Sequence, residues 1–239
     1  VFQGLQNLGK YDKKTYKFSK RDKTTVYPFP PVEREFIFTT LHLMEDYIKD
    51  KKGDEEIIAS YPVDFITFSY YRSRVVSAEE TEAAEKIIDT NTLEGIENPY
   101  LPKTDWGWTI DPDGLMLALQ ELAGRYEKPL FISENGLGAI DTVGENHTIN
   151  DIYRIQYMKG HIEAMKRAIE NGVNLFGYTM WGPIDIVSNG TGQMSKRYGI
   201  IYVDLDDNGH GTGKRYKKRS YDWYKKVIAS NGEELSIEK

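Results

Sequence analysis

Cysteine is absent from the 239 residues of this chain. Its absence excludes disulfide bonds, thiolate zinc sites and a cysteine nucleophile. A chain without disulfides fits a reducing compartment, so we expect a cytoplasmic protein. Apolar runs of membrane-spanning length and a charged-then-apolar leader are also missing, and no membrane partner is expected.

A basic excess is missing as well. The chain has 31 Lys and Arg against 37 Asp and Glu, a formal net charge of −6, which argues against nucleic-acid binding. Aromatic residues are plentiful by contrast, at 13% with 17 Tyr and 4 Trp. Aromatic clefts suit sugars, whose C–H faces pack on rings, although a large core collects aromatic residues too.

The most informative stretch is PLFISENG, residues 129–136, in which a short apolar run precedes Glu134. The run is typical of a buried parallel strand, and Glu134 stands where that strand leaves the core. In a β/α barrel the strand C-termini open onto one face, where catalytic side chains lie. A Glu placed there suits nucleophilic attack on a sugar carbon. A strand end followed by an ordinary Asn-Gly turn would explain the same residues.

Two other runs predict buried strands, at residues 63–71 and 175–181. Tyr71 ends the first and could hydrogen-bond a nearby carboxylate, or simply pack there. Trp181 stands at the mouth of the second. A shorter strand is expected at residues 200–203. Helices are expected at residues 33–49, 113–126 and 220–228, and a short acidic helix or a frayed loop at residues 78–88. A longer helix is expected between a cap at Asn150 or Asp151 and a left-handed Gly172.

This spacing shows about three barrel strands, whereas a complete eight-fold barrel needs roughly 250 residues. The predicted fold class is therefore α/β, a partial (β/α)8 barrel. Residues 51–239 form its C-terminal half, and residues 1–50 are an atypical N-terminal segment of unclear match.

The loop after Trp181 carries a hydroxyl at Ser188, an ammonium at Lys196 and a phenol at Tyr198. Donors on a loop that folds over a pocket could hold a phosphate monoester, with Lys as a point charge. Ser, Lys and Tyr are also common in loops that bind nothing. Residues 206–209 lack the spacing of a calcium loop, and no metal site is expected.

Six stretches between about residue 54 and residue 234 carry a resemblance to a known family: VDFITFSYY, DWGWTIDPDGL, RYEKPLFISENGLGAID, INDIYRIQYMKGHIEAM, GYTMWGPIDIVS and KRYGIIYVDLDD. In these stretches the chain resembles the C-terminal half of family 1 glycoside hydrolases, in their 6-phospho-β-glucosidase branch. The resemblance implies that Glu134 is the nucleophile, Tyr71 its hydrogen-bond partner and Trp181 the sugar platform, without metal or cofactor. It also implies that Ser188, Lys196 and Tyr198 form the 6-phosphate site.

The residues at the phosphate site favour one branch of the family. Ordinary family 1 β-glucosidases carry a Glu-Trp pair where this chain has Ser188-Asn189. A carboxylate there would repel a phosphate dianion by several kcal/mol in a partly dry site, roughly as Coulomb's law gives. The family's 6-phospho-galactosidases tend to have Trp at the position of Asn189, so its absence favours the gluco series.

One expected element is missing. The family's general acid/base is the Glu of an Asn-Glu pair, and this chain has no such dipeptide. A retaining mechanism needs a second carboxyl roughly 5 Å from the first. We therefore expect a retaining 6-phospho-β-glucosidase that is a fragment, a remnant or one portion of an enzyme, nearly inactive alone. Its partners would be a phosphorylated β-glucoside and a second copy or an N-terminal half. The alternative is a non-catalytic half-barrel fragment that binds phospho-sugars or associates with itself.

Overall fold

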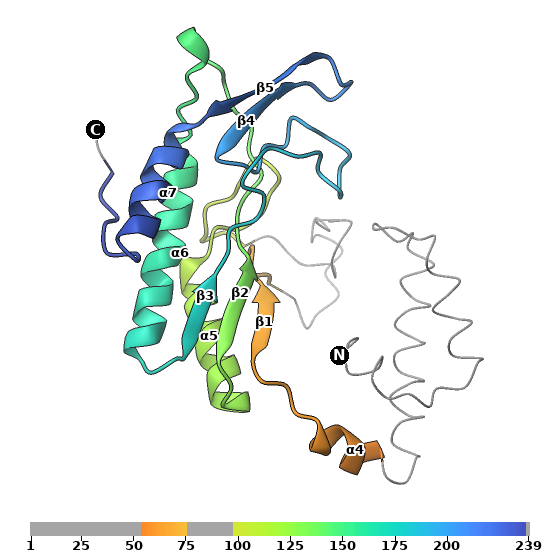
Figure 1. Cartoon of the computed structure of the whole chain (residues 1–239), viewed down its shortest axis with the longest axis vertical. Helices are drawn as coiled ribbons and strands as arrows, with labels where there is room; N and C mark the ends of the chain where they lie inside the picture. Colours follow the sequence, from red (N-terminus) through yellow and green to blue (C-terminus); the bar gives the residue numbers. More distant parts are fainter. Residues whose placement is uncertain (1–53, 76–97, 238–239) are drawn as a thin grey trace, which may run out of the picture. The chain divides into compact units, whose positions relative to one another are not determined.

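The computed structural model describes residues 54–75 and 98–237, in two compact units (Figure 1). The first unit comprises Val1–Val63 and Asp89–Leu93, and its described part holds helix α4, Asp54–Ser60, in which the Ser60 hydroxyl donates to the Glu56 carbonyl at 2.6 Å. The second unit comprises Asp64–Ile88 and Glu94–Lys239 and is described below. The helices expected at residues 33–49 and 78–88 lie outside the described residues.

A three-stranded parallel sheet forms the centre of the second unit. Its strands, in spatial order, are β1 (Ile66–Ser69), β2 (Leu130–Glu134) and β3 (Leu175–Tyr178). Figure 1 shows the three arrows side by side and pointing the same way. Each strand lies inside a stretch predicted from the apolar pattern, so these three predictions are confirmed, although β1 and β3 are shorter than expected.

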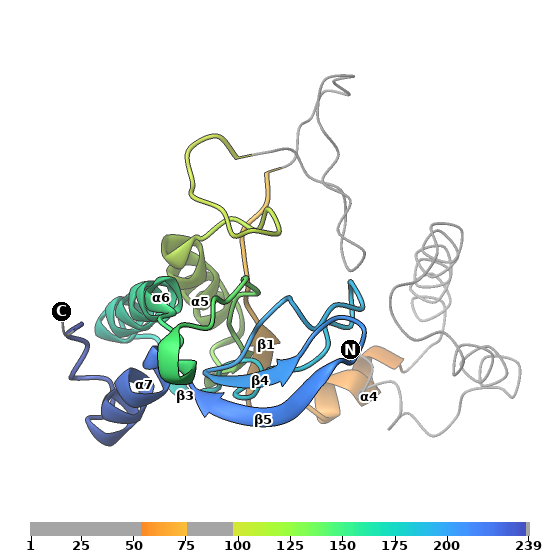
Figure 2. The same cartoon turned by 90° about the horizontal axis from the view of Figure 1, so that it is seen from above.

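Three helices accompany this sheet: α5 (Pro112–Tyr126), which packs on β2, α6 (Ile152–Glu170), which packs on α5, and α7 (Arg219–Ala229), which packs on α6. In Figure 2 they lie together on one side of the strands. Chain order is strand, helix, strand, helix, strand, which is the repeat of a β/α barrel. The predicted helices at residues 113–126 and 220–228 and the helix ending before Gly172 are confirmed.

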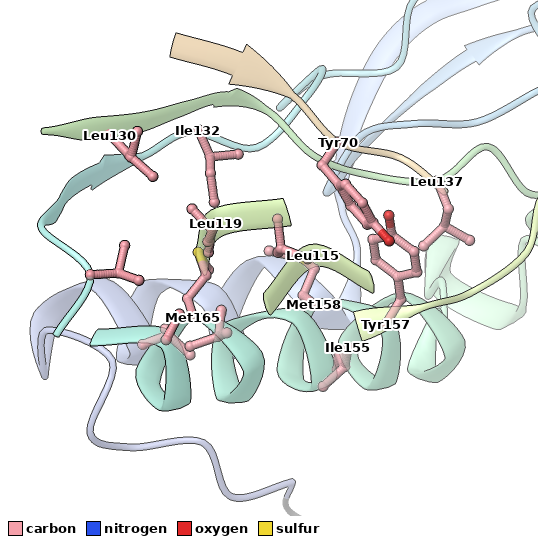
Figure 3. Close-up of a cluster of buried hydrophobic side chains, with 14 of the residues drawn as sticks. Tyr70, Leu115, Leu119, Leu130, Ile132, Leu137, Ile155, Tyr157, Met158 and Met165 are labelled. Carbon is pink, nitrogen blue, oxygen red and sulfur yellow. The ribbon is translucent and has the colours of Figure 1, made fainter. Parts of the chain in front are cut away.

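The hydrophobic core lies between β2 and the helices. Leu130 and Ile132 are fully buried and point toward Leu115 and Leu119 of α5, which are also fully buried (Figure 3). Their side chains alternate with that of Phe131, as the two-residue period of a strand requires. The sheet therefore has one face built for helices.

The opposite face of the sheet is aromatic and open. The Phe176 ring contacts those of Phe131 and Phe65 at centroid distances of 5.5 and 5.3 Å, yet Phe176 and Phe65 are 56% and 48% exposed. Parallel sheets are normally buried on both faces. This face corresponds to the interior of a closed barrel, and the described strands form only part of one.

Two helix ends follow the expected capping chemistry, and the start of α6 does not. Asp111 caps α5 by accepting a hydrogen bond from the Gly114 amide at 2.9 Å. Gly172, just beyond α6, has φ +91° and takes the predicted left-handed position. Asp151 precedes α6, but its carboxylate makes no cap bond because it contacts Arg154 and Ser220 instead.

A second, antiparallel sheet pairs β4 (Ile201–Leu205) with β5 (Gly211–Lys217). The predicted strand is confirmed, but β5 was missed. Its residues are mostly exposed and lack the alternation of apolar and polar side chains that marks a strand. Within the described ranges, none of the helices is both long and apolar enough to cross a bilayer.

His161 of α6 is a buried histidine in contact with the core. Its Nδ1 lies 2.8 Å from the Tyr157 carbonyl, and its ring lies 4.0 Å from that of Tyr157. Burial lowers the pKa of His161 to about 4. The imidazole is therefore neutral in the folded protein at neutral pH.

We expect the free energy of unfolding to fall as the pH drops from about 6.5 to about 4, by roughly 3 kcal/mol from this residue. The sign follows because the unfolded chain, with the higher pKa, binds the proton first. Denaturant unfolding across this pH range measures the loss. Subtracting the profile of His161→Gln removes the contribution of the carboxylates, which both proteins share. Identical profiles for the two proteins would contradict the prediction.

Candidate active site

Glu134 is the last residue of β2, and its carboxylate is held by two hydroxyl donors. The Tyr71 phenol donates to Oε2 at 2.9 Å and the Ser69 hydroxyl donates to the same oxygen at 3.0 Å. The donors lie at the end of β1, which pairs with β2 so that Ser69 stands opposite Glu134. The pairing of two parallel strands thus brings three polar side chains to one edge of the sheet.

Tyr71 is a fixed donor in this arrangement. Burial raises its pKa far above the ordinary value, and the hydrogen bond to the Glu134 carboxylate raises it further. The phenol is therefore protonated at neutral pH. It keeps the Glu134 carboxylate in one orientation, as a positioned nucleophile requires.

Asn135 anchors the segment that follows Glu134. Its side chain is fully buried; its Nδ2 donates to the Tyr70 carbonyl at 2.7 Å, and its Oδ1 accepts from the Tyr178 phenol at 3.0 Å. Residues 135–138 continue without a turn, and neither Asn135 nor Gly136 is left-handed. The alternative of an ordinary Asn-Gly turn is therefore not what the chain forms. The role of this Asn was missed, because three separate elements must assemble before its partners exist.

Trp181 lies beside the same segment. It follows the end of β3, its amide donates to the Asn135 carbonyl at 2.9 Å, and a Cβ on Gly136 would come within 3.5 Å of its side chain. The Trp181 ring meets that of Tyr198 edge-on at 6.5 Å. Trp181 thus lies between the Glu134 segment and the loop of predicted phosphate donors.

The three predicted phosphate donors also lie close together. The Ser188 hydroxyl is 3.0 Å from the Tyr198 phenol, and both residues are buried. Lys196 is buried too, with its ammonium 5.8 Å from the centre of the Tyr198 ring. Two hydroxyls and one ammonium are therefore grouped on this loop.

Two tryptophans complete the surroundings of Lys196. Its ammonium lies 4.4 Å from the Trp108 ring centre and 5.2 Å from that of Trp106. Trp108 in turn meets the Tyr71 ring edge-on at 5.5 Å. A continuous chain of contacts therefore joins Lys196 to Glu134 through Trp108 and Tyr71. Neither tryptophan was predicted as a site residue, although the aromatic density of DWGW was a usable signal.

The backbone after Glu134 packs directly against Lys196. A Cβ added to Gly138 would lie 2.6 Å from Cγ and 2.7 Å from Cε of Lys196. The neighbouring Arg197 turns away, donating to the Val203 and Leu205 carbonyls at 2.9 and 2.6 Å. Among the described residues there is no group of three or more acidic, His or Cys side chains arranged to hold a metal ion.

The Glu134 carboxylate lies at the carboxyl edge of a parallel β/α sheet, which is where the active sites of barrel enzymes lie. The chain belongs to glycosyl hydrolase family 1, whose family model matches residues 8–233. The match begins inside the N-terminal segment that had no visible match in the sequence. The domain boundary at residue 50 stays a prediction.

Three curated relatives show how the chain compares with whole proteins. It is 46% identical to aryl-phospho-beta-D-glucosidase BglH of Bacillus subtilis (98% of this chain, 48% of the relative). It is 53% identical to 6-phospho-beta-glucosidase AscB of Escherichia coli (79% and 39%) and 54% identical to a phospho-cellobiase of Klebsiella oxytoca (72% and 37%). The chain spans about half the length of these relatives or less.

The fold has solved counterparts. The family 1 β-glucosidase of Thermotoga maritima, in complex with galacto-hydroximolactam, superposes with a TM-score of 0.65 at 31% identity. The superposition covers 82% of this chain and 41% of that one. It confirms the predicted partial (β/α)8 barrel.

Gly138→Ala should lower the free energy of unfolding by about 1–3 kcal/mol, because the new methyl group would overlap Lys196. Gly138 does not have a positive φ, so backbone strain adds nothing. Gly124→Ala is the matched control: Gly124 lies in α5 with open space around it, and Ala there should stabilise the helix by roughly 0.5–1 kcal/mol. Denaturant unfolding of the three proteins measures both effects. A Gly138→Ala protein as stable as the control would refute the close packing of Lys196.

Proposed function

We propose that the chain is the catalytic portion of a retaining glycoside hydrolase that acts on 6-phospho-β-glucosides, with Glu134 as nucleophile. The observation that supports this most strongly is the chain of contacts from the Glu134 carboxylate through Tyr71 and Trp108 to Lys196. It puts an anion and a cation at the two ends of one aromatic-lined site. A sugar with an anomeric carbon at one end and a phosphate at the other matches that polarity.

In the proposed reaction, a Glu134 carboxylate oxygen attacks the anomeric carbon and the bond to the leaving oxygen breaks. The bonding electron pair goes to the leaving group. Water then attacks the same carbon, loses its proton to the surrounding water and releases Glu134 as a carboxylate. Tyr71 and Ser69 keep the attacking carboxylate oriented, and Trp181 offers a ring face to the sugar C–H groups.

The proposed phosphate site consists of Ser188, Lys196 and Tyr198. Lys196 supplies positive charge, and the two hydroxyls can donate to phosphate oxygens. Two unit charges 4 Å apart interact by about 4 kcal/mol at an effective dielectric of 20, so a Ser in place of a Glu at position 188 removes a large repulsion. The family's 6-phospho-galactosidases tend to have Trp at the position of Asn189, so the Asn favours glucosides over galactosides.

The acid/base carboxyl is not assigned to any residue of this chain. General acid help is worth about 10²–10⁴ in rate, and an alkyl leaving group needs it. A dinitrophenolate leaves without a proton. We therefore expect this chain alone to react only with substrates that carry such activated leaving groups.

A non-catalytic half-barrel that binds phospho-sugars is the alternative. The exposed Phe65 and Phe176 on the open sheet face favour it, because such a face is normally covered in a working barrel. In either case we infer a cytoplasmic role in carbohydrate metabolism, since the chain has no cysteine and its proposed ligand is a charged sugar.

The chain should form a covalent adduct with dinitrophenyl 2-deoxy-2-fluoro-β-glucoside 6-phosphate. The fluorine slows hydrolysis of the intermediate, and the activated leaving group needs no acid. Intact-mass measurement should show one added fluoro-sugar phosphate, and peptide mapping should place it on Glu134. Glu134→Gln is the control and should remain unlabelled. Label on another residue would exclude the nucleophile assignment, and binding of glucose 6-phosphate without any label would support the binding module.

Lys196→Met should slow labelling by the phosphorylated reagent about 10–100-fold, the usual range for a lost charge-assisted hydrogen bond. Labelling by the unphosphorylated reagent should change little. Lys214→Met, at an exposed position on β5, is the matched control and should behave as the unaltered chain. Equal slowing with both reagents would remove Lys196 from the phosphate site.

A further inference from the structure

Six ionisable side chains form a buried ion cluster behind the proposed phosphate site. It contains three carboxylates and three cations, and each side chain is 6% exposed or less. Burying an ion costs solvation free energy unless the ion is paired. A buried cluster of this size, with equal numbers of both charges, therefore suits a role in holding neighbouring segments in one geometry. Its members are Asp141, Asp151, Arg154, Asp185, Arg197 and Lys218.

Arg154 of α6 connects the two segments that form the site. Its Nη1 donates to the Leu137 carbonyl at 3.0 Å and to the Tyr198 carbonyl at 2.9 Å, and its Nη2 donates to the Arg197 carbonyl at 3.2 Å. Leu137 lies three residues after Glu134, and the other two acceptors follow Lys196 directly. One guanidinium therefore spans the nucleophile segment and the phosphate loop.

The orientation of Arg154 is itself fixed. Asp151 accepts from its Nε at 3.0 Å and also accepts from the Ser220 amide at 2.9 Å, so the carboxylate is tied to the start of α7. Arg154 is 1% exposed and Asp151 is fully buried. The guanidinium has little freedom to follow a displaced loop.

The loop is fixed at its other end by the same cluster. Asp185 accepts from the Gly199 amide and from the Lys218 ammonium, both at 2.8 Å. Ala139 and Arg197 exchange two backbone hydrogen bonds, at 3.0 and 2.9 Å. The loop between residues 185 and 199 is thus closed on itself and attached to the segment after Glu134.

We propose that Arg154 is a positioning residue that sets the separation between the Glu134 carboxylate and the phosphate donors, and so sets the preference for phosphorylated over unphosphorylated sugars. Arg154 contacts backbone carbonyls, cluster side chains and the Tyr153 phenol, to which its Nη2 donates at 3.2 Å, and it acts through Lys196 and Tyr198. A planar guanidinium can reach three fixed acceptors at once, whereas the ammonium of a lysine is a single point on a flexible stem. The proposal rests on the proposed function.

Arg154→Lys tests the proposal, because it keeps the buried charge and removes the fork. The measurement is the rate of covalent labelling by the phosphorylated and unphosphorylated fluoro-glucosides, taken as a ratio. Arg167→Lys is the matched control, the same change on the same helix at a half-exposed residue paired with Asp113. We expect the ratio to fall at least tenfold in Arg154→Lys, because the phosphorylated rate falls further than the unphosphorylated one, and to stay constant in the control.

Three results would overturn the proposal. Both labelling rates could stay those of the unaltered chain, or both could fall by the same factor, which indicates a structural role only. If Arg154→Lys does not fold, Asp151→Asn replaces it as the test, because it keeps Arg154 but removes its carboxylate partner. This variant should also lower the ratio. Failure of both variants to fold is the third result that would overturn the proposal. An unaltered chain without any preference for the phosphorylated reagent would instead reject the proposed function.

Discussion

The hydrogen bond from Tyr71 to Glu134 depends on a single constraint, the parallel register of β1 and β2. That register places Ser69 opposite Glu134 and puts the Tyr71 phenol within 2.9 Å of the carboxylate. In a parallel sheet the carboxyl ends of the strands share one edge, so side chains far apart in sequence meet without any loop having to fold over them. A slip of one residue would move the core side chains of β2, such as Ile132, to the open face. The hydrophobic core and the site are thus fixed by the same register.

The remainder of the site is held by polar contacts to the backbone. Asn135 fixes the segment after the strand, and the buried ion cluster fixes the loop that carries Lys196. The loop has little regular secondary structure, so the hydrogen bonds of its backbone must be met by side chains. Burying charges for that purpose stabilises one geometry at a cost in solvation. Lys218 reflects the cost, because burial and the nearby Arg154 lower its pKa while Asp185 and Asp141 oppose the change.

Much of this could be predicted from the sequence because the signals are local. Apolar runs gave the three parallel strands, and Gly172 gave the end of α6. The loop donors were identified by residue type and by resemblance to the family. Strand β5 was missed because its mostly exposed residues lack the alternation of a strand. Trp108, Asn135 and Arg154 were missed, since each acquires its role from partners tens of residues away. Asp151 was missed for a similar reason. Its position predicts a helix cap, but its carboxylate accepts a hydrogen bond from Arg154 and does not cap α6.

The central claim is that one site holds the anomeric carbon at Glu134 and the phosphate at the loop. A crystal structure of the chain bound to glucose 6-phosphate tests it most directly. The account predicts the phosphate within hydrogen-bond reach of Ser188, Lys196 and Tyr198, and the anomeric carbon about 3–3.5 Å from a Glu134 carboxylate oxygen. Phosphate density elsewhere on the protein, or a sugar with its anomeric carbon pointing away from Glu134, would contradict it.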